Sequence, residues 1–114
     1  MVQQRASEER RTRRVAVVVR VKAIHADEEH YLLSENLSVE GIFLNTIAPF
    51  PLETELILEF ELPVTSQRVV LRGVVQRINP TSPGGWRPGM GIRFTDYVEG
   101  TQSMVRQFVE GLAG

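Results

Sequence analysis

Cysteine is absent from the sequence, which excludes disulfides and thiolate metal sites. No apolar run approaches the roughly 20 residues that a membrane-spanning helix needs, so we expect no membrane insertion. The chain begins with polar and charged residues rather than an apolar stretch, which argues against a signal peptide and favours a cytoplasmic protein. No Ser/His/Asp set and no pair of carboxylates with catalytic spacing stands out, so we predict that the protein is not an enzyme and carries no cofactor.

The formal net charge of −1 conceals an uneven distribution of charge along the chain. Residues 1–22 carry seven basic and two acidic side chains, a net charge of +5, whereas the remainder carries six basic and twelve acidic ones, a net charge of −6. A basic segment on an acidic body suggests that an anionic ligand binds to that segment rather than to the whole surface. The alternatives are a segment that stays solvated or one that docks on its own acidic body.

Six segments have the alternating or β-branched pattern that is typical of strands, and turn-rich stretches separate them. These segments are residues 15–23, 31–36, 41–46, 55–62, 68–78 and 89–94. The alternation is clearest in the fourth, where Leu56, Leu58 and Phe60 face one way and glutamates face the other. Residues 26–29 are predicted to form a polar turn. The chain length allows one domain, and the pattern predicts a mainly β barrel or sandwich of six or seven strands.

The period becomes helical after the last of these strands. Apolar side chains recur every four residues, at Met104, Phe108 and Leu112. This spacing predicts a C-terminal helix, and Asp96 with Glu99 resembles a capping box at its start. Residues 1–9 are polar and without period, so we expect a flexible tail followed by one folded domain over residues 10–114.

Four arginines stand immediately before the first predicted strand, at Arg10, Arg11, Arg13 and Arg14. A guanidinium is always charged and offers a planar fork of donors, which suits phosphate oxygens or the O6/N7 edge of guanine. Composition alone also fits a solvated basic tail. The second notable segment is Asn36-Leu37-Ser38-Val39-Glu40-Gly41, whose residue types favour a turn and a close approach of the backbone.

Together these segments resemble the RxxxR and (D/N)xSxxG motifs of the PilZ domain family. The first motif is Arg10-x-x-x-Arg14, and Asn36-x-Ser38-x-x-Gly41 follows about twenty residues later, with no departure at a key position. The similarity continues through 73–75 and 88–94 and covers about residues 9–112. It implies a six-stranded antiparallel PilZ-like β-barrel with a C-terminal α-helix, whose ligand is cyclic di-GMP.

In the family, the arginine segment is loose without ligand and wraps around the nucleotide when it binds. The resemblance therefore implies that Arg10, Arg11 and Arg14 contact phosphates and guanine edges. It also implies that Asn36 and Ser38 hydrogen-bond guanine at the barrel surface, with Gly41 letting the base lie close.

For Arg77 and Trp86 the sequence allows both a binding role and a purely structural role. Arg77 stands where relatives often have a tryptophan, so it either stacks on guanine or is an exposed strand arginine. Trp86 is either an anchor for a protein partner or a side chain packed over the barrel end. His25 and His30 flank acidic residues, but their spacing matches no common ligand pattern, so we predict no metal site.

The function that the resemblance implies is a cyclic di-GMP receptor that orders its arginine segment on binding and signals through a protein effector. Motility, polysaccharide export and biofilm control are all compatible outputs. The alternative is a PilZ-fold adaptor that acts through protein partners without nucleotide. We expect no binding of nucleic acid, because the body is acidic and lacks an aromatic-studded strand face. We expect a monomer or a weak dimer.

Overall fold

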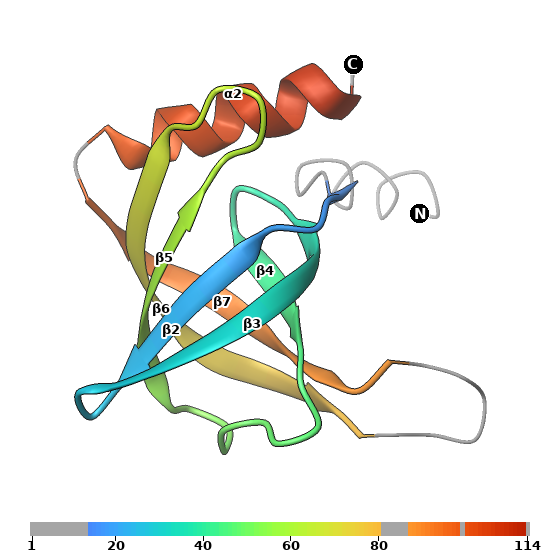
Figure 1. Ribbon diagram of the computed structural model, residues 1–114, viewed down its shortest axis with the longest axis vertical. Helices are drawn as coiled ribbons and strands as arrows, with labels where there is room; N and C mark the ends of the chain where they lie inside the picture. Colours follow the sequence, from blue (N-terminus) through green and yellow to red (C-terminus); the bar gives the residue numbers. More distant parts are fainter. Residues whose placement is uncertain (1–13, 81–86, 99, 114) are drawn as a thin grey trace, which may run out of the picture.

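The computed structural model describes residues 14–80, 87–98 and 100–113 (Figure 1). The strands and the helix of these residues are β1 (Val15–Ala16), β2 (Arg20–His25), β3 (Glu28–Leu37), β4 (Gly41–Asn45), β5 (Glu55–Glu61), β6 (Arg68–Asn79), β7 (Gly89–Tyr97) and α2 (Thr101–Ala113).

The strands close into an antiparallel barrel. Six strands pair around the ring in the order β3-β2-β5-β6-β7-β4, and β4 pairs back onto β3 to close it. The two-residue strand β1 is additional and pairs with the end of β3. The predicted six-stranded antiparallel barrel with a C-terminal helix is therefore confirmed.

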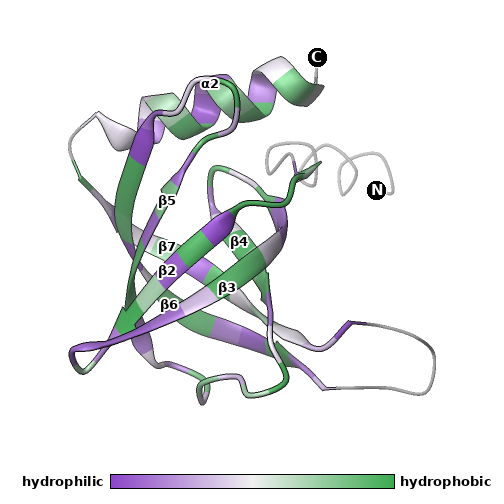
Figure 2. Ribbon diagram, in the orientation of Figure 1, coloured by the Kyte–Doolittle hydropathy of each residue, from purple (hydrophilic) through white to green (hydrophobic). Residues whose placement is uncertain are grey.

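Alternation along the strands builds the core (Figure 2). In β5, Leu56, Leu58 and Phe60 are buried, while the intervening residues are exposed or half-buried, as the sequence pattern predicts. The helix α2 lies against β6 and β1. Its Val105 and Val109 are almost completely buried in the same core. Helix and barrel thus share one hydrophobic interior.

Two local predictions are wrong at the start of the barrel. The single strand expected over 15–23 is interrupted at residues 17–19, which separate β1 from β2. The turn expected over 26–29 contains only Ala26 and Asp27, whose φ angles of 51° and 67° are both left-handed. Positive φ at both central residues is the geometry that lets a two-residue hairpin follow the strand twist. The next residues already belong to β3.

The predicted capping box is also wrong. Strand β7 continues through Asp96 to Tyr97, and α2 begins at Thr101. Gly100 lies before the helix rather than in its first turn, with φ of 86°. The reason is that β6 offers partners to β7 as far as Tyr97, and this pairing outweighs a local capping signal. In the described part of the chain, no helix has the length and apolarity needed to cross a membrane.

Candidate functional site

The segment 36–41 comprises the end of β3, the turn at residues 38–40 and the first residue of β4, and Ser38 organises it. The Ser38 hydroxyl accepts hydrogen bonds from the backbone N–H groups of Glu40, at 3.2 Å, and Gly41, at 3.1 Å. The Ser38 N–H donates to the Gly41 carbonyl at 2.8 Å. The side chain of Ser38 is buried, so these bonds satisfy groups that water reaches poorly. The turn expected here is confirmed, and Ser38 is its central side chain.

Gly41 begins β4 at a point of close contact with β7. A Cβ atom at this position would lie 2.4 Å from the carbonyl oxygen of Ile92. The glycine is therefore required by the approach of two strands. This observation gives a structural reason for the last position of the motif that does not depend on a ligand.

Strand β1 brings Arg14, the last arginine of the first motif, close to this turn. Val15 pairs with Leu37, and Ala16 pairs with Asn36. Continuing the register by one residue places Arg14 at the level of Ser38. Arg14 is exposed and has no ion pair with any residue that the structure describes. The end of the first motif and the beginning of the second are therefore neighbours, although twenty-one residues separate Arg14 from Asn36 in the sequence.

Asn36 and Arg77 lie in one cross-strand row of the barrel wall. Asn36 pairs with Phe43, Phe43 with Gly91, and Gly91 with Arg77. The Arg77 guanidinium lies 5.9 Å from the centroid of the Phe43 ring, and its side chain covers Gly91. The row thus carries an amide, an aromatic ring and a cation along β3, β4, β7 and β6 (Figure 1). Sequence reasoning missed Phe43, because its position in an apolar strand carries no separate signal.

Tyr97 links the turn to the end of β7. Its hydroxyl donates a hydrogen bond to the carbonyl of Val39, and its ring packs edge-on against Phe94. Burial raises the pKa of Tyr97 to about 12, with Arg106 opposing the shift and Glu40 adding to it. Nothing in the sequence spacing pointed to this residue, because its partner is 58 positions away.

Several predicted residues lie outside the described residues or away from the turn. Arg10, Arg11, Arg13 and Trp86 belong to the first group. His25 and His30 belong to the second, and both pack against Phe50, with ring centroids at 5.2 and 5.1 Å. Within the described ranges, no group of three or more potential metal ligands occurs.

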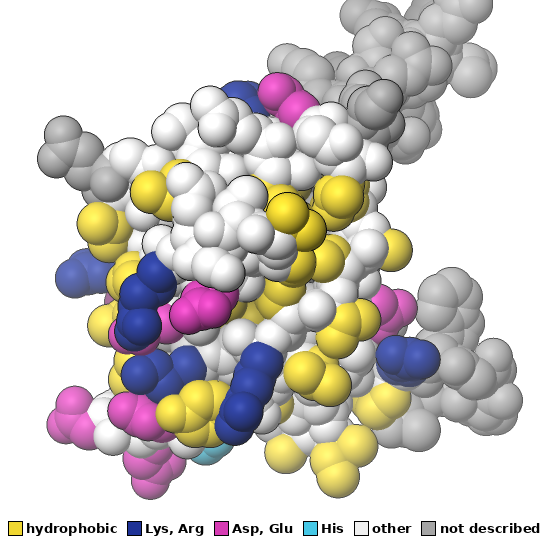
Figure 3. Space-filling view, turned by 45° about the horizontal axis from the view of Figure 1, so that its top comes forward, with side chains coloured by type: hydrophobic (Ala, Val, Ile, Leu, Met, Phe, Trp, Pro, Cys, Tyr) yellow, Lys and Arg dark blue, Asp and Glu magenta, His cyan; other side chains and the backbone are white. Residues whose placement is uncertain are grey.

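A groove of about 650 Å³ lies elsewhere on the barrel, between the start of β2 and the end of β5. Val19 and Phe60 are buried at its base, and Arg20 stacks on Tyr31 at its edge, 4.7 Å from the ring centroid. Figure 3 shows that hydrophobic, basic and acidic side chains are interspersed over the visible face of the molecule.

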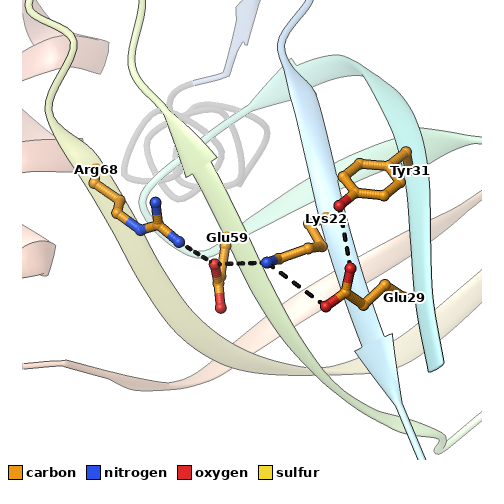
Figure 4. A network of polar contacts seen from close by, with 5 residues as sticks. All are labelled: Lys22, Glu29, Tyr31, Glu59 and Arg68. Carbon is orange, nitrogen blue, oxygen red and sulfur yellow. Dashed lines mark hydrogen bonds and ion pairs between the residues drawn. The ribbon is translucent and has the colours of Figure 1, made fainter. Parts of the chain in front are cut away.

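The charges at this groove largely neutralise one another (Figure 4). Lys22 Nζ lies 3.3 Å from Glu59 Oε1 and 3.9 Å from Glu29 Oε2. Arg68 also pairs with Glu59, and the Tyr31 hydroxyl donates to Glu29 at 3.1 Å. Three cations thus stand beside three carboxylates at the groove, namely Arg20, Lys22 and Arg68 beside Glu29, Glu59 and Glu61. This balance gives little preference for a doubly charged anion.

Comparison with known proteins identifies the fold. The model of the PilZ domain matches residues 4–111. The Bacillus subtilis inhibitor of motility, MotI/DgrA, has a TM-score of 0.77 and 24 % identity, over 88 % of this chain and 49 % of that one. The chain therefore spans about half the length of MotI/DgrA. The PilZ domain of CeSA from a cellulose-synthesizing bacterium has a TM-score of 0.61 and 21 % identity, over 89 % of this chain and 98 % of that one. No curated protein matches the chain significantly.

Proposed function

Because the chain belongs to the PilZ domain family, whose members are generally receptors for cyclic di-GMP, we propose that it binds this nucleotide and signals through a protein partner. The proposed site combines the arginine arm, defined as residues 10–14, with the turn 36–41. PilZ domains are generally binding and adaptor domains, so the proposal involves no catalysis.

The pairing of β1 with β3 is the observation that carries the proposal. It places Val15 opposite Leu37 and Ala16 opposite Asn36, and Arg14, the last residue of the arm, directly precedes these pairs in the chain. Within the described part of the chain Arg14 has no ion pair, and a guanidinium near the Asn36 amide matches the two chemistries of a guanine dinucleotide. Phosphate oxygens take the fork of arginine donors, and guanine edges offer both donors and acceptors to asparagine.

The geometry of the turn refines the expected roles. The hydroxyl of Ser38 is already bonded to the turn, so its main contribution is to hold Asn36 and the backbone in place. Asn36 is half-buried on the barrel wall and is the better candidate for a direct bond to guanine. Arg77, at the other end of the cross-strand row, covers the buried Phe43 ring and can stack on a base through its outer face.

Isothermal titration with cyclic di-GMP tests the proposal. We expect saturable binding by the wild type, and binding about tenfold weaker or more for Arg10→Ala, Arg14→Ala and Asn36→Ala, because each loses a hydrogen bond to a charged or buried group. Arg68→Ala is the matched control, since it removes an exposed arginine at the groove instead. Equal affinities for all variants, or a loss confined to Arg68→Ala, would contradict the proposed site.

The output of the receptor is a further part of the proposal. MotI/DgrA is an inhibitor of motility, so a swimming assay with the gene deleted and restored is the first test of the pathway. If the wild type fails to bind the nucleotide in the titration, the protein is instead an adaptor that acts through protein partners alone. We expect a monomer or weak dimer, which light scattering with and without nucleotide measures.

A further inference from the structure

The junction between β1 and β2 contains one residue more than the strand it faces. From the pair Val15–Leu37 to the pair Arg20–Leu33, the chain advances five residues on the first side and four on the second. The surplus residue forms a bulge over residues 17–19, where Val18 is 64 % exposed. A bulge of this kind leaves main-chain N–H and C=O groups without their usual ladder partners.

Ser34, on β3, supplies the missing partners. Its hydroxyl donates to the carbonyl of Val17 at 2.7 Å and accepts from the N–H of Val19 at 2.9 Å. Its own N–H donates to the Val19 carbonyl at 2.9 Å. The side chain is completely buried, so water cannot replace these bonds. Only a hydroxyl of this length can both donate and accept within the bulge.

Strand β1 is short. It contains only two residues, its ladder consists of two pairs with β3, and α2 also contacts it. Val15 is buried in the core and Val17 is packed against it, but Ala16 is exposed. The Ser34 hydroxyl bonds to the main chain of Val17 and Val19, on both sides of the exposed Val18, and so ties the residues between β1 and β2 to β3.

We propose that Ser34 is a positioning residue of the ligand site, because it holds β1, and with it Arg14, beside the segment 36–41. The expected effect on binding rests on the proposed function, whereas the expected effect on β1 does not. With β1 anchored, Arg14 directly precedes a paired strand, whereas with β1 released it lies six residues from the start of β2 at Arg20.

Anchoring β1 raises the affinity for the nucleotide, because fewer residues must become ordered when it binds. With β1 released, the nucleotide must fix residues 15–19, each at an entropic cost. This cost predicts that Ser34→Ala weakens binding of cyclic di-GMP by about tenfold or more, without touching any group that contacts the nucleotide.

Hydrogen exchange and titration on the full-length protein test the inference. In Ser34→Ala we expect amide exchange at Val15, Ala16 and Val19 to accelerate at least tenfold beyond the change in β5 and β6, together with the tenfold loss of affinity. Ser34→Thr keeps the hydroxyl and should restore protection of these amides and most of the affinity.

Val69→Ala is the control for a purely structural effect. Val69 is buried in β6, so its truncation lowers global stability without reaching the bulge. We expect Val69→Ala to bind cyclic di-GMP within twofold of the wild type. Equal losses of affinity in Ser34→Ala and Val69→Ala, or unchanged exchange at Val15 and Val19 in Ser34→Ala, would overturn the inference. If the wild type does not bind cyclic di-GMP, the proposed function fails, and the exchange data alone decide whether Ser34 anchors β1.

Discussion

At the scale of single residues, two glycines with opposite surroundings give a matched test of strand packing. A Cβ on Gly41 would lie 2.4 Å from the Ile92 carbonyl oxygen, whereas a Cβ on Gly111 in α2 would meet nothing within 4 Å. We therefore expect Gly41→Ala to destabilise the protein by about 1–3 kcal/mol, because β4 must move from β7. Gly111→Ala should stabilise it by about 0.5–1 kcal/mol through helix propensity. Urea denaturation measures both, and a neutral Gly41→Ala would contradict the close approach.

The motif residues show what sequence can and cannot predict at this scale. The types and spacing of residues 36–41 predicted a turn, because serine and asparagine bond to nearby backbone, and the bonds of Ser38 confirm it. Sequence allowed either a positive φ or a close approach at Gly41, and only the position of β7 decides between them. The contacts of the arginine arm with a nucleotide remain predictions. Tyr97 and Phe43 could not be found, because their partners lie far along the chain.

At the scale of elements, the hydrogen bond from Tyr97 to Val39 connects the end of β7 to the β3–β4 turn. Its pKa is raised from 10.0 to about 12, first by burial. The folded protein therefore keeps a proton that the unfolded chain loses between pH 10 and 12. The stability that this group contributes is complete below pH 10 and is lost as pH rises through that window.

Replacing this tyrosine separates its hydrogen bond from its ionisation. We expect Tyr97→Phe to lose about 1 kcal/mol at pH 7, because the Val39 carbonyl loses its donor. Between pH 10 and 12 its unfolding free energy should fall less steeply than that of the wild type. Urea midpoints across this pH range measure the difference, and parallel curves for the two proteins would show that Tyr97 titrates as it does in the unfolded chain.

Element positions were largely predictable, whereas their junctions were not. Alternation located β5 and most of β6, because a strand with one buried face imposes a period of two. The bulge at 17–19 was not predicted, because valines on both faces of this segment give no pattern that marks the interruption. The capping signal at Asp96 failed because pairing with β6 extends β7 past it.

At the scale of the whole molecule, closure of the barrel depends on pairings that local patterns do not specify. Strand β4 pairs with β7 and β2 pairs with β5, across long stretches of chain. Periodicity left the choice between a barrel and a sandwich open, and only the family resemblance implied the barrel. Every strand of the closed ring and α2 contribute to the core of the described residues, and we predict that the arm serves binding rather than the fold.

Removal of residues 1–13 tests this division between arm and barrel. The described core begins at Val15, so the shortened chain should keep its urea midpoint and change in stability by no more than about 0.5 kcal/mol. The deletion removes four arginines, Arg5, Arg10, Arg11 and Arg13, together with Glu8 and Glu9, and so a net charge of +2. Loss of several charged partners of the ligand should weaken cyclic di-GMP binding at least about thirtyfold. Salt should weaken binding by the wild type more than the residual binding by the shortened chain, because screening acts on the missing charges. If the shortened chain kept its affinity, cyclic di-GMP would not bind at the arm. If the shortened chain failed to fold, the arm would contribute to the stability of the barrel.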